Sequence, residues 1–483
     1  MPGIVAYGAY VPYYRLQRSA IGAALGSGGG KGTRAVASYD EDSTSMGVEA
    51  ARIAMRAAEG IAPQSVVFAT STPSYLDKTN ATAIHAALGL PPNTGAFDMV
   101  GSVRSAIAAQ RFANMSPTPI LAVLADMRGG LPGGADERDG GDAAVAFLFS
   151  GSMFDSRALA ERIGGGAATN EFLDRWRIPG EDASHVWEER FGEHAYVPLA
   201  EIAINDALKQ AGVTPSELDY VIVAGLHSRA VKRVAGSIGA RPEAIVDDLS
   251  SVIGNTGTAH GALLLASVLD RAEPGQTILT VLLSDGADAA VLRTTDELVG
   301  YRDRRATTVA EQVAAGRDDL GYQTYLTWRG FLQREPPRRP DPERPAAPPS
   351  LRTEPWKYGF VGSKCTVCGT RHLPPARVCV RCGAVDQMES ERLADVPGTI
   401  ATYTIDRLAF SLSPPVVVGV IDFDGGGRYQ CELTDVDPAT VKIGDRVEMS
   451  FRRLFTADGV HNYFWKAKPI QGDRDINDTA GGS

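Results

Sequence analysis

Hydrophobic positions in the first 330 residues follow two alternating patterns. Ala-rich segments with helical spacing lead into short apolar runs, such as "SVVFAT" (65–70) and "YVIVAG" (220–225), which are bounded by Gly, Pro or Ser. Strands that alternate with helices of about 10 to 15 residues are typical of α/β folds. The pattern therefore predicts largely parallel sheets whose faces are covered by helices.

This α/β pattern occurs twice. "VEAARIAMRAAEGIAPQSVVFATS" (48–71) matches "AEIAINDALKQAGVTPSELDYVIVAG" (200–225) as an Ala-rich helix, a proline turn and an apolar strand. "GGDAAVAFLF" (140–149) and "SDGADAAVLR" (284–293) match in the same order further along. Two matches in one order indicate an internal duplication. Two such halves packed together predict a layered α/β/α/β/α body.

The pattern changes after residue 334. "REPPRRPDPERPAAPPSLRTEPW" (334–356) is rich in proline, which predicts a semi-rigid, extended linker without a folded element. Beyond it, "GTIATYTIDRL" (398–408) and "VKIGDRVEMSFRRL" (441–454) alternate apolar and polar residues. This alternation, interrupted by Gly and Pro, predicts a small antiparallel barrel.

Four of the five cysteines form a metal-ligand pattern. In "CTVCGTRHLPPARVCVRCG", Cys365 and Cys368 form one Cys-x-x-Cys pair, and Cys379 and Cys382 form another. Two such pairs supply the four thiolates that surround zinc tetrahedrally in structural sites. We expect a closed structural zinc site, because no ligand position is left for water.

The net charge and the hydropathy of the chain argue against some classes of binding partner. The formal net charge is -10, which argues against nucleic acid or an anionic membrane surface as a partner. "NYFWKAKP" (462–469) interleaves aromatic and basic residues, as a base-stacking platform does, but a barrel strand with core aromatics is the alternative that we favour. No run is long enough to span a bilayer, and no signal peptide is visible, so we expect a cytoplasmic protein.

Several segments of the body carry a resemblance to a known family. The body resembles the 3-hydroxy-3-methylglutaryl-CoA synthase branch of the thiolase superfamily over about residues 1–330. The segments that carry it are "GIVAYGAYVPYYRL", "RAVASYDEDSTSMGVEAAR", "IHAALGL", "IGNTGTAHGALLLA" and "LLSDGADAAVLR". The resemblance implies a duplicated thiolase fold, a homodimer formed through the body, and carbon–carbon bond chemistry on acyl-CoA substrates that bring coenzyme A with them.

The C-terminal segments resemble the rubredoxin-like zinc ribbon and OB-fold module that accompanies acyl-CoA-handling thiolases. The expected domains are then a thiolase-like N-terminal half (1–165), a thiolase-like C-terminal half (166–333), the linker (334–356), the zinc ribbon (357–390), the OB-fold barrel (391–470) and a disordered tail (471–483).

The positions that correspond to the family's nucleophile and its acid/base carry serine here. The family's catalytic cysteine falls on Ser102 in "DMVGSVRSAIAAQ" (98–110), and its glutamate falls on Ser71. A serine hydroxyl needs a dedicated base, and no Ser-His-Asp pattern accompanies Ser102. A cap or substrate hydrogen bond is the favoured role for Ser102, and a covalent acyl-serine is the alternative.

Other family positions are retained. The family's histidine corresponds to His227, for which the alternative is a structural histidine that caps the next helix. Its asparagine corresponds to Asn255, a donor to a carbonyl oxygen or simply a turn residue. Substrate-binding candidates are Gly286, which resembles an oxyanion-site glycine, together with Tyr75 and His260 as secondary proton-transfer candidates.

Three functions are compatible with these residues. The first is a cysteine-independent enzyme that makes or breaks a carbon–carbon bond by aldol or retro-aldol chemistry on a β-hydroxyacyl-CoA. The second is an acyltransferase that uses Ser102. The third is a non-catalytic acyl-CoA-binding scaffold that recruits partner enzymes such as a hydratase.

Overall fold

The computed structural model describes residues 3–152 and 157–470. Contacts divide the chain into two units. The first unit, here called the body, comprises Met1–Ser38, Asp42–Ile84 and Pro92–Phe331. The second unit, here called the C-terminal module, comprises Tyr39–Glu41, His85–Pro91 and Leu332–Ser483.

A nine-stranded sheet runs through the body in the order β11-β12-β13-β8-β1-β7-β6-β4-β5. The first half contributes β1 (Gly3–Tyr10), β4 (Ser65–Thr70), β5 (Gly95–Val100), β6 (Ile120–Met127) and β7 (Asp142–Phe149). The second half contributes β8 (Ala160–Ala168), β11 (Tyr220–Gly225), β12 (Thr277–Leu283) and β13 (Ala287–Thr294). β1 and β8 pair antiparallel at Gly3–Glu161 and Ile4–Ala160, which joins the two halves.

The strand order confirms the duplication. Outward from the junction, the first half reads β1-β7-β6-β4, and the second reads β8-β13-β12-β11, with equivalent strands at equivalent positions. β5 extends the first half, and an isolated bridge from Val221 to Ile245 stands in its place in the second. The predicted duplicated thiolase fold is therefore present.

The expectation of largely parallel sheets is wrong. β4 pairs in parallel with β5 and β6, and β11 pairs in parallel with β12, whereas the remaining pairs of this sheet are antiparallel. The reason is local for β12 and β13, because only Ser284, Asp285 and Gly286 connect them. A connection this short allows a hairpin but not a parallel crossover.

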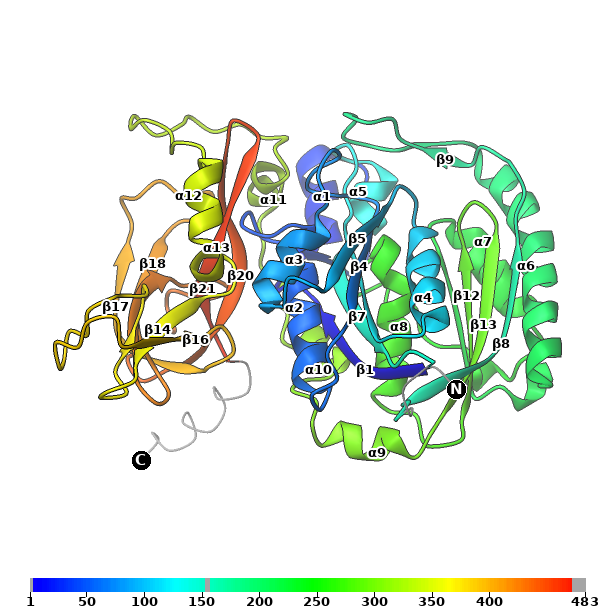
Figure 1. Ribbon diagram of the computed structural model, residues 1–483. Helices are drawn as coiled ribbons and strands as arrows, with labels where there is room; N and C mark the ends of the chain where they lie inside the picture. The colour runs from blue at the N-terminus through cyan, green and yellow to red at the C-terminus, as the bar shows by residue number, and fades with distance from the viewer. Residues whose placement is uncertain (1–2, 153–156, 471–483) are drawn as a thin grey trace, which may run out of the picture. The chain divides into compact units, whose positions relative to one another are not determined.

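Helices cover and separate the two halves of the sheet, as Figure 1 shows. α2 (Ser43–Arg56) packs against β1, β6 and β7. α4 (Ser105–Met115) and α8 (His260–Leu269) form the middle layer, and α6 (Glu189–Ala211) and α7 (Ser228–Ser237) cover the second half. These five layers match the predicted α/β/α/β/α arrangement.

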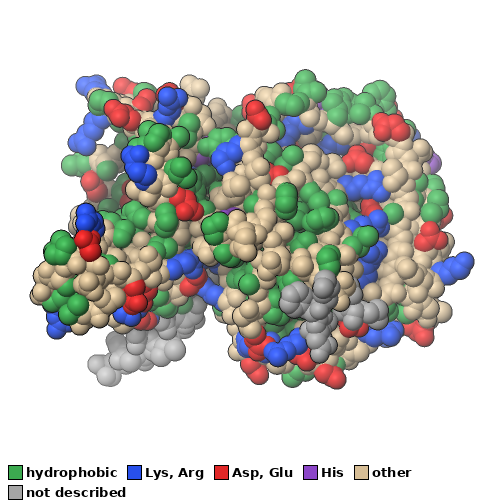
Figure 2. All heavy atoms as spheres, viewed as in Figure 1, with side chains coloured by type: hydrophobic (Ala, Val, Ile, Leu, Met, Phe, Trp, Pro, Cys, Tyr) green, Lys and Arg blue, Asp and Glu red, His purple; other side chains and the backbone are tan. Residues whose placement is uncertain are grey.

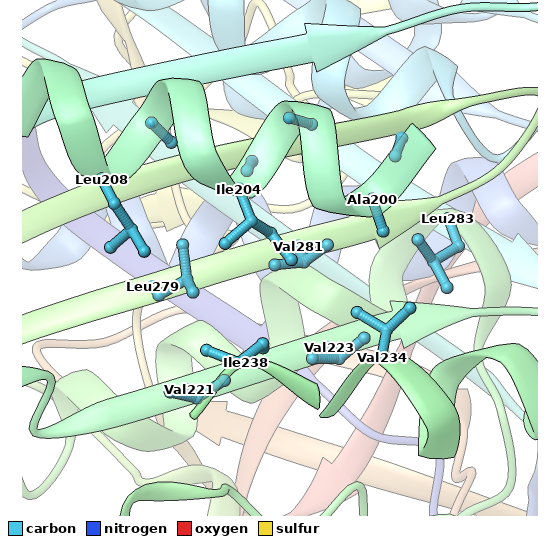
Figure 3. Close-up of a cluster of buried hydrophobic side chains, with 14 of the residues drawn as sticks. Ala200, Ile204, Leu208, Val221, Val223, Val234, Ile238, Leu279, Val281 and Leu283 are labelled. Carbon is cyan, nitrogen blue, oxygen red and sulfur yellow. The ribbon is translucent and has the colours of Figure 1, made fainter. Parts of the chain in front are cut away.

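The outer layer of the second half shows how these helices are held. Ala200, Ile204 and Leu208 recur every four residues along α6, so they share one face. The helix packs on β8 and β13 and also reaches β12, whose Leu279, Val281 and Leu283 belong to the same cluster (Figure 3). Truncating such a buried leucine to alanine costs about 2 to 5 kcal/mol, so this layer contributes substantially to stability.

Shorter elements complete the body and its connections. They are β2 (Tyr14–Gln17), α1 (Arg18–Leu25), β3 (Thr33–Val36), α3 (Ala81–Leu88), α5 (Ala135–Asp139), β9 (Arg175–Trp176), β10 (His185–Val186), α9 (Glu297–Arg302), α10 (Val309–Ala314) and α11 (Tyr322–Trp328). Within the described residues, no helix has the length and apolar character that crossing a membrane requires.

The C-terminal module contains two antiparallel sheets. The first has the order β15-β14-β16, with β14 (Val361–Cys365), β15 (Arg371–His372) and β16 (Met388–Arg392). The second has the order β19-β18-β17-β20-β21, with β17 (Gly398–Asp406), β18 (Val416–Phe423), β19 (Arg428–Glu432), β20 (Arg446–Ala457) and β21 (Val460–Pro469). The Thr434 N–H donates to the Ala467 carbonyl, which brings the chain after β19 against β21. The predicted zinc-ribbon and OB-fold architecture is confirmed.

The aromatic residues of β21 lie mostly inside the barrel. Tyr463 and Trp465 are buried, and so is the side chain of Lys466. Trp465 packs edge-on against Phe451 of β20, as a core residue does. Of the aromatic residues in "NYFWKAKP", Phe464 is the one that is only half-buried.

The proline-rich linker is not wholly extended, contrary to the expectation. It contains α12 (Ala347–Arg352) and α13 (Glu354–Lys357). Pro348 and Pro355 fall within the first turns of these helices, where the missing N–H groups would have had no helical partner. The tail that we expected at 471–483 lies outside the described residues.

Candidate functional site

Ser71 and Asp126 meet at the carboxyl ends of two neighbouring strands. Ser71 follows β4, and Asp126 lies near the end of β6, which pairs in parallel with β4. The Ser71 Oγ donates to Asp126 Oδ2 at 2.8 Å, and the Ser71 N–H donates to Oδ1 at 2.6 Å. Both residues are buried.

The second half of the body binds the same carboxylate. The N–H and Oγ1 of Thr258 each donate to Asp126 Oδ2, both at 2.7 Å. Thr70 Oγ1 donates to Asp126 Oδ1 at 3.0 Å. Neutral donors therefore satisfy both oxygens of Asp126, and they connect Ser71 to the loop that begins at Asn255.

Two arginines also converge on Ser71. Arg128 Nη1 donates to the Ser71 Oγ at 3.4 Å, and Arg177 Nη2 donates to its carbonyl oxygen at 2.6 Å. Arg128 is only 7% exposed. Burial lowers the pKa of its guanidinium from the usual value, against the attraction of Asp126 and Asp136. Two arginines and the Asp126 carboxylate thus contact Ser71, the position at which the resemblance expects a glutamate.

A pocket of about 640 Å³ lies beside this cluster. Three of the sequence-predicted residues line it, namely His227, Asn255 and His260. Asp174 and Arg175 line it as well. Ser71, Tyr75, Ser102 and Gly286 are not among the described residues that line it.

His227 is the N-cap of α7. Its Nδ1 accepts a hydrogen bond from the Ala230 N–H at 3.1 Å, which leaves the proton of the neutral ring on Nε2. Nε2 has no hydrogen-bond partner and neither does Asp174 Oδ1, although both are buried. Both atoms lie within 2.7 Å of the point that a Cβ atom on Gly192 would occupy.

Asp174 is a pocket residue that the sequence did not reveal. The Tyr196 hydroxyl donates to its Oδ2 at 3.2 Å. Asp174 lies in "NEFLDRWR" (170–177), a region with no helical or strand periodicity and no match in the repeat. No pattern in the sequence indicates that this segment reaches His227.

Asn255 and His260 are held by the backbone around them. Asn255 Nδ2 donates to the Gly225 carbonyl at 2.8 Å, and its Oδ1 accepts from the Gly257 N–H at 3.0 Å. An amide nitrogen carries two hydrogens, so one remains for a ligand. His260 is buried, and burial lowers the pKa of its imidazole to about 4, so it is neutral near pH 7.

Ser102 belongs to the turn before α4. Its Oγ accepts the Arg104 N–H at 3.3 Å. The Arg104 guanidinium extends to Asp288 Oδ2 at 2.8 Å and to the Asp285 carbonyl at 2.6 Å, and it lies against Gly286.

Tyr75 lies in the loop after β4. Its backbone N–H and carbonyl bond the Asn80 side chain at 3.0 and 2.9 Å.

The four cysteines form a cluster in the C-terminal module. All four sulfur atoms lie within 4.8 Å of one another, with Cys368–Cys379 at 3.5 Å and Cys365–Cys382 at 3.7 Å. Four thiolates at the Zn–S distance of a tetrahedral site would be about 3.8 Å apart. The donor set and its spacing therefore fit zinc.

The two cysteine pairs have equivalent backbone structures. The Gly369 N–H donates to the Cys365 carbonyl at 2.8 Å, and the Gly383 N–H donates to the Cys379 carbonyl at 2.9 Å. Both glycines have a positive φ, 73° and 74°, which a side chain disfavours. Each turn thereby directs two sulfur atoms to one centre.

Three family models match parts of the chain. ChsH2, rubredoxin-like zinc ribbon domain, matches residues 357–389, and ChsH2, C-terminal OB-fold domain, matches residues 391–452. The 3-oxoacyl-[acyl-carrier-protein (ACP)] synthase III C-terminal model matches residues 208–293. They agree with the architecture of the two units.

Known proteins extend the comparison to the whole body. Hydroxymethylglutaryl-CoA synthase from Methanopyrus kandleri is 30% identical over 341 residues, which is 67% of this chain and 95% of the relative. The enzyme of the same name from Aeropyrum pernix is 31% identical over 347 residues, which is 68% of this chain and 94% of the relative.

Solved structures share the fold. A crystal structure of HMG-CoA synthase complexed with CoA matches with a TM-score of 0.58 at 18% identity, and it covers 67% of this chain and 89% of that one. MvaS in complex with 3-hydroxy-3-methylglutaryl coenzyme A matches with a TM-score of 0.56 at 19% identity, and it covers 81% of this chain and 99% of that one.

These relatives confirm the resemblance, and they identify this chain as an enzyme that acts on CoA thioesters. The four-cysteine cluster and the C-terminal models account for the remainder of the chain. The chain belongs to the hydroxymethylglutaryl-CoA synthase family of the thiolase superfamily, and it carries a zinc ribbon and an OB-fold domain after its thiolase-like body.

Proposed function

We propose that this enzyme makes or breaks a carbon–carbon bond of a β-hydroxyacyl-CoA by aldol or retro-aldol chemistry, without a covalent acyl-enzyme. The observation that carries the proposal is the environment of Ser102. Among the described residues, the one hydrogen bond of its Oγ comes from the Arg104 N–H. Within the described part of the chain no residue accepts a hydrogen bond from this hydroxyl, so it lacks the hydrogen-bonded base that a serine nucleophile requires.

An aldol cleavage does not need a nucleophile on the enzyme. In the pocket, Asp174 Oδ1 has no hydrogen-bond partner and is the group that would take the proton of the β-hydroxyl as a carbonyl forms. The electrons of the broken carbon–carbon bond move to the thioester as an enolate, and the Asp174 carboxyl then returns the proton to the α-carbon of the released thioester. In this proposal, the free amide hydrogen of Asn255 and the Nε2–H of His227 stabilise the enolate oxygen.

In this proposal the serines and the secondary residues have supporting roles. Ser102 shapes the turn before α4, and Ser71 orders the polar cluster around Asp126. Neither takes the acyl group. Tyr75 and Gly286 support the loops around the site, and His260 remains neutral inside it.

The test is turnover of a panel of β-hydroxyacyl-CoAs, with the released carbonyl compound and the shortened thioester measured together. Equal amounts of both products, with no acylated protein by intact-mass spectrometry, would support the proposal. A panel without carbonyl release, or an adduct on Ser102, would contradict it. The Ser102 acyltransferase is the alternative that the adduct would favour.

We also propose that two copies of this chain form a homodimer through the edge strand β5. β5 is the open end of the body's sheet, and Phe97 and Val100 on it are 53% and 45% exposed. Phe112 and Met115 on the neighbouring α4 are 47% and 77% exposed. Hydrophobic side chains are visible on the face of the body that Figure 2 presents. An apolar edge strand of this kind is suited to pair with its copy in a second chain.

We propose that the C-terminal module binds one zinc ion and contacts a partner enzyme. The four cysteines would hold one structural zinc ion, and a reducing compartment such as the cytoplasm suits their thiolates. Near them, Val367, Val378, Val380 and Val385 are at least 50% exposed. We propose this valine surface as the contact for a partner enzyme such as a hydratase, which is also the contact that a non-catalytic scaffold would use.

A further inference from the structure

Gly192 and Tyr196 lie on one face of α6, beside the pocket residues Asp174 and His227. They are four residues apart in the helix, so they share a face, and both are buried. The Tyr196 hydroxyl donates to Asp174 Oδ2 at 3.2 Å, and the ring centroids of Tyr196 and His227 lie 6.0 Å apart. One side chain of α6 is therefore placed against both pocket residues.

The Tyr196 phenol is a fixed, neutral hydrogen-bond donor. Its ring packs edge-on against Phe172 at 5.1 Å, and the residue is 5% exposed. Burial raises the pKa of the phenol, and the carboxylates of Asp174 and Asp285 raise it further, against a backbone hydrogen bond at Asp285. The hydroxyl consequently keeps its proton at neutral pH. Because it engages Oδ2 of Asp174, the unpartnered Oδ1 is the oxygen available to a ligand.

Gly192 leaves the space in which Asp174 and His227 converge. A Cβ atom on Gly192 would lie 2.7 Å from Asp174 Oδ1, 2.6 Å from His227 Nε2 and 2.4 Å from the adjacent ring carbon. Side chains do not approach other atoms this closely, so any side chain here would displace one of the two residues. Asp174 and His227 are only 6% and 8% exposed, and buried polar atoms without a partner, such as these two, are rare.

We propose that Gly192 and Tyr196 are positioning residues, which place Asp174 at the β-hydroxyl and His227 at the thioester oxygen of the substrate. This inference rests on the proposed function, in which these two groups act on those two oxygens. In a β-hydroxyacyl thioester the two oxygens are carried by carbon atoms on either side of the α-carbon, so two converging polar groups can bind both. Neither Gly192 nor Tyr196 is among the described residues that line the pocket, so both act through Asp174 and His227.

The positioning of Asp174 should make the site selective for the β-hydroxyl. A thioester without this hydroxyl leaves Oδ1 of Asp174 buried and unpaired, and sites built to bind a hydroxyl discriminate strongly against ligands that lack it. The selectivity depends on which carboxylate oxygen faces the pocket. The Tyr196 hydroxyl therefore contributes to it without touching the ligand.

The binding test compares both enantiomers of 3-hydroxybutyryl-CoA with butyryl-CoA on the full-length protein, by isothermal titration calorimetry. The thioesters have the same carbon chain and differ by the β-hydroxyl. The native protein should bind one hydroxylated enantiomer roughly tenfold to hundredfold more tightly than butyryl-CoA, because it alone satisfies the carboxylate. Tyr196→Phe keeps the ring and removes the hydroxyl. It should reduce the preference to about threefold or less and change the Kd of butyryl-CoA by less than about threefold.

Gly192→Ala tests the space beside the helix. Alanine suits a helix interior better than glycine, so the substitution does not weaken α6 itself. Its methyl group would displace Asp174 or His227, so the preference for the hydroxylated thioester should fall as it does in Tyr196→Phe.

Each variant has a matched control outside the pocket. Gly236→Ala changes an exposed glycine of α7, where a Cβ atom would meet no other atom within 4 Å. Tyr7→Phe removes another buried phenol that donates to a carboxylate, here Asp270 Oδ1 at 2.8 Å. Both controls should keep the native preference for the hydroxylated thioester.

Three results would overturn the inference. They are equal binding of all three thioesters by the native protein, an unchanged preference in both Tyr196→Phe and Gly192→Ala, and a Tyr196→Phe variant that weakens every thioester equally, as a purely structural tyrosine would. Carbonyl release tests the proposed function separately. A hydroxyl preference that depends on Tyr196, without carbonyl release, would retain the positioning role and reject the aldol reaction. Carbonyl release with an unchanged preference in both variants would do the reverse.

Discussion

The backbone N–H of Arg104 donates to the Oγ of Ser102 across 3.3 Å, so the hydroxyl at the family's nucleophile position is part of a helix-leading turn. The side chain of the same arginine extends to Asp288 and to the Asp285 carbonyl. Ser102 and Arg104 together therefore connect the start of α4 to the β12–β13 hairpin of the second half. This arrangement is suited to support a site rather than to attack a thioester.

Arg104, and not Ser102, is the N-cap of α4, so Ser102→Ala should leave turnover within about threefold of the native enzyme and lower stability by about 1 kcal/mol, the usual net contribution of one hydrogen bond. The physical reason is that the substitution removes one backbone-to-hydroxyl hydrogen bond and no reacting group. Steady-state kinetics and thermal unfolding measure the two effects. A loss of turnover above a hundredfold, together with an acyl adduct on the native protein alone, would show that Ser102 is the nucleophile.

His227 caps α7 and also lines the pocket. Two substitutions distinguish its capping role from its proposed catalytic role. Asparagine is a good N-cap, so His227→Asn should keep the bond from the Ala230 N–H, whereas His227→Ala should lose it and about 1 kcal/mol of stability. Both variants should lose roughly a hundredfold or more in kcat, because neither can donate from an imidazole Nε2.

The comparison of these two variants is the control for His227. Near-native kcat in His227→Asn, with a stability loss in His227→Ala alone, would mean that the histidine only caps α7. Unfolding and kinetics should be measured on the same preparations.

The sequence predicted much of the fold because its elements are repeated and strongly patterned. The matched segments at 48–71 and 200–225 correspond to equivalent helix–strand units, α2–β4 and α6–β11. The strand directions were predicted less well, since the "SDG" connection (284–286) is a hairpin, which requires an antiparallel pair where the prediction had a largely parallel sheet.

The site was predicted only where it coincides with the family's positions. His227, Asn255 and His260 line one pocket, but Asp174 and Arg177 come from a segment without periodicity. Their approach depends on how the loop before α6 folds back, which is a tertiary property. Arg128 carried a weak local signal, as a charged residue directly after the buried strand "ILAVLADM" (120–127).

Zinc removal should unfold the C-terminal module. Cys365→Ser and Cys379→Ser change equivalent positions in the two turns, so each should lower the zinc content well below one ion per chain and destabilise the module to a similar extent. Structural zinc contributes on the order of 10 kcal/mol to folding of small modules. Elemental analysis and calorimetry measure the two effects, with Cys431→Ser as the control outside the cluster. A metal-free native protein with a fully stable module would contradict the site.

Charges on the open edge strand should separate the dimer. Val100→Lys and Phe97→Glu place a charge on β5 where each native side chain is about half exposed, so the fold should persist while pairing between copies fails. Sedimentation velocity should show a dimer for the native protein and a monomer for the variants, with Ile443→Lys, at a 67% exposed position in the C-terminal module, as the control. A native monomer, or dimers in both edge variants, would reject this interface.

Stability of the body should fall as the pH drops from 6.5 toward 4, and His260 should account for much of the change. Burial lowers the pKa of His260 to about 4, whereas an exposed histidine has a pKa of about 6.5. Between these values the unfolded chain binds a proton that the folded chain excludes, so acid favours unfolding. Above about pH 6.5, His260 is neutral in both states and does not lower the free energy of unfolding. By pH 5, its protonation in the unfolded chain should lower that free energy by roughly 2 kcal/mol. His260→Gln cannot titrate, so calorimetry of the body's transition at pH 7.5 and pH 5 should show a smaller loss for this variant, and equal losses in both proteins would contradict a buried neutral His260.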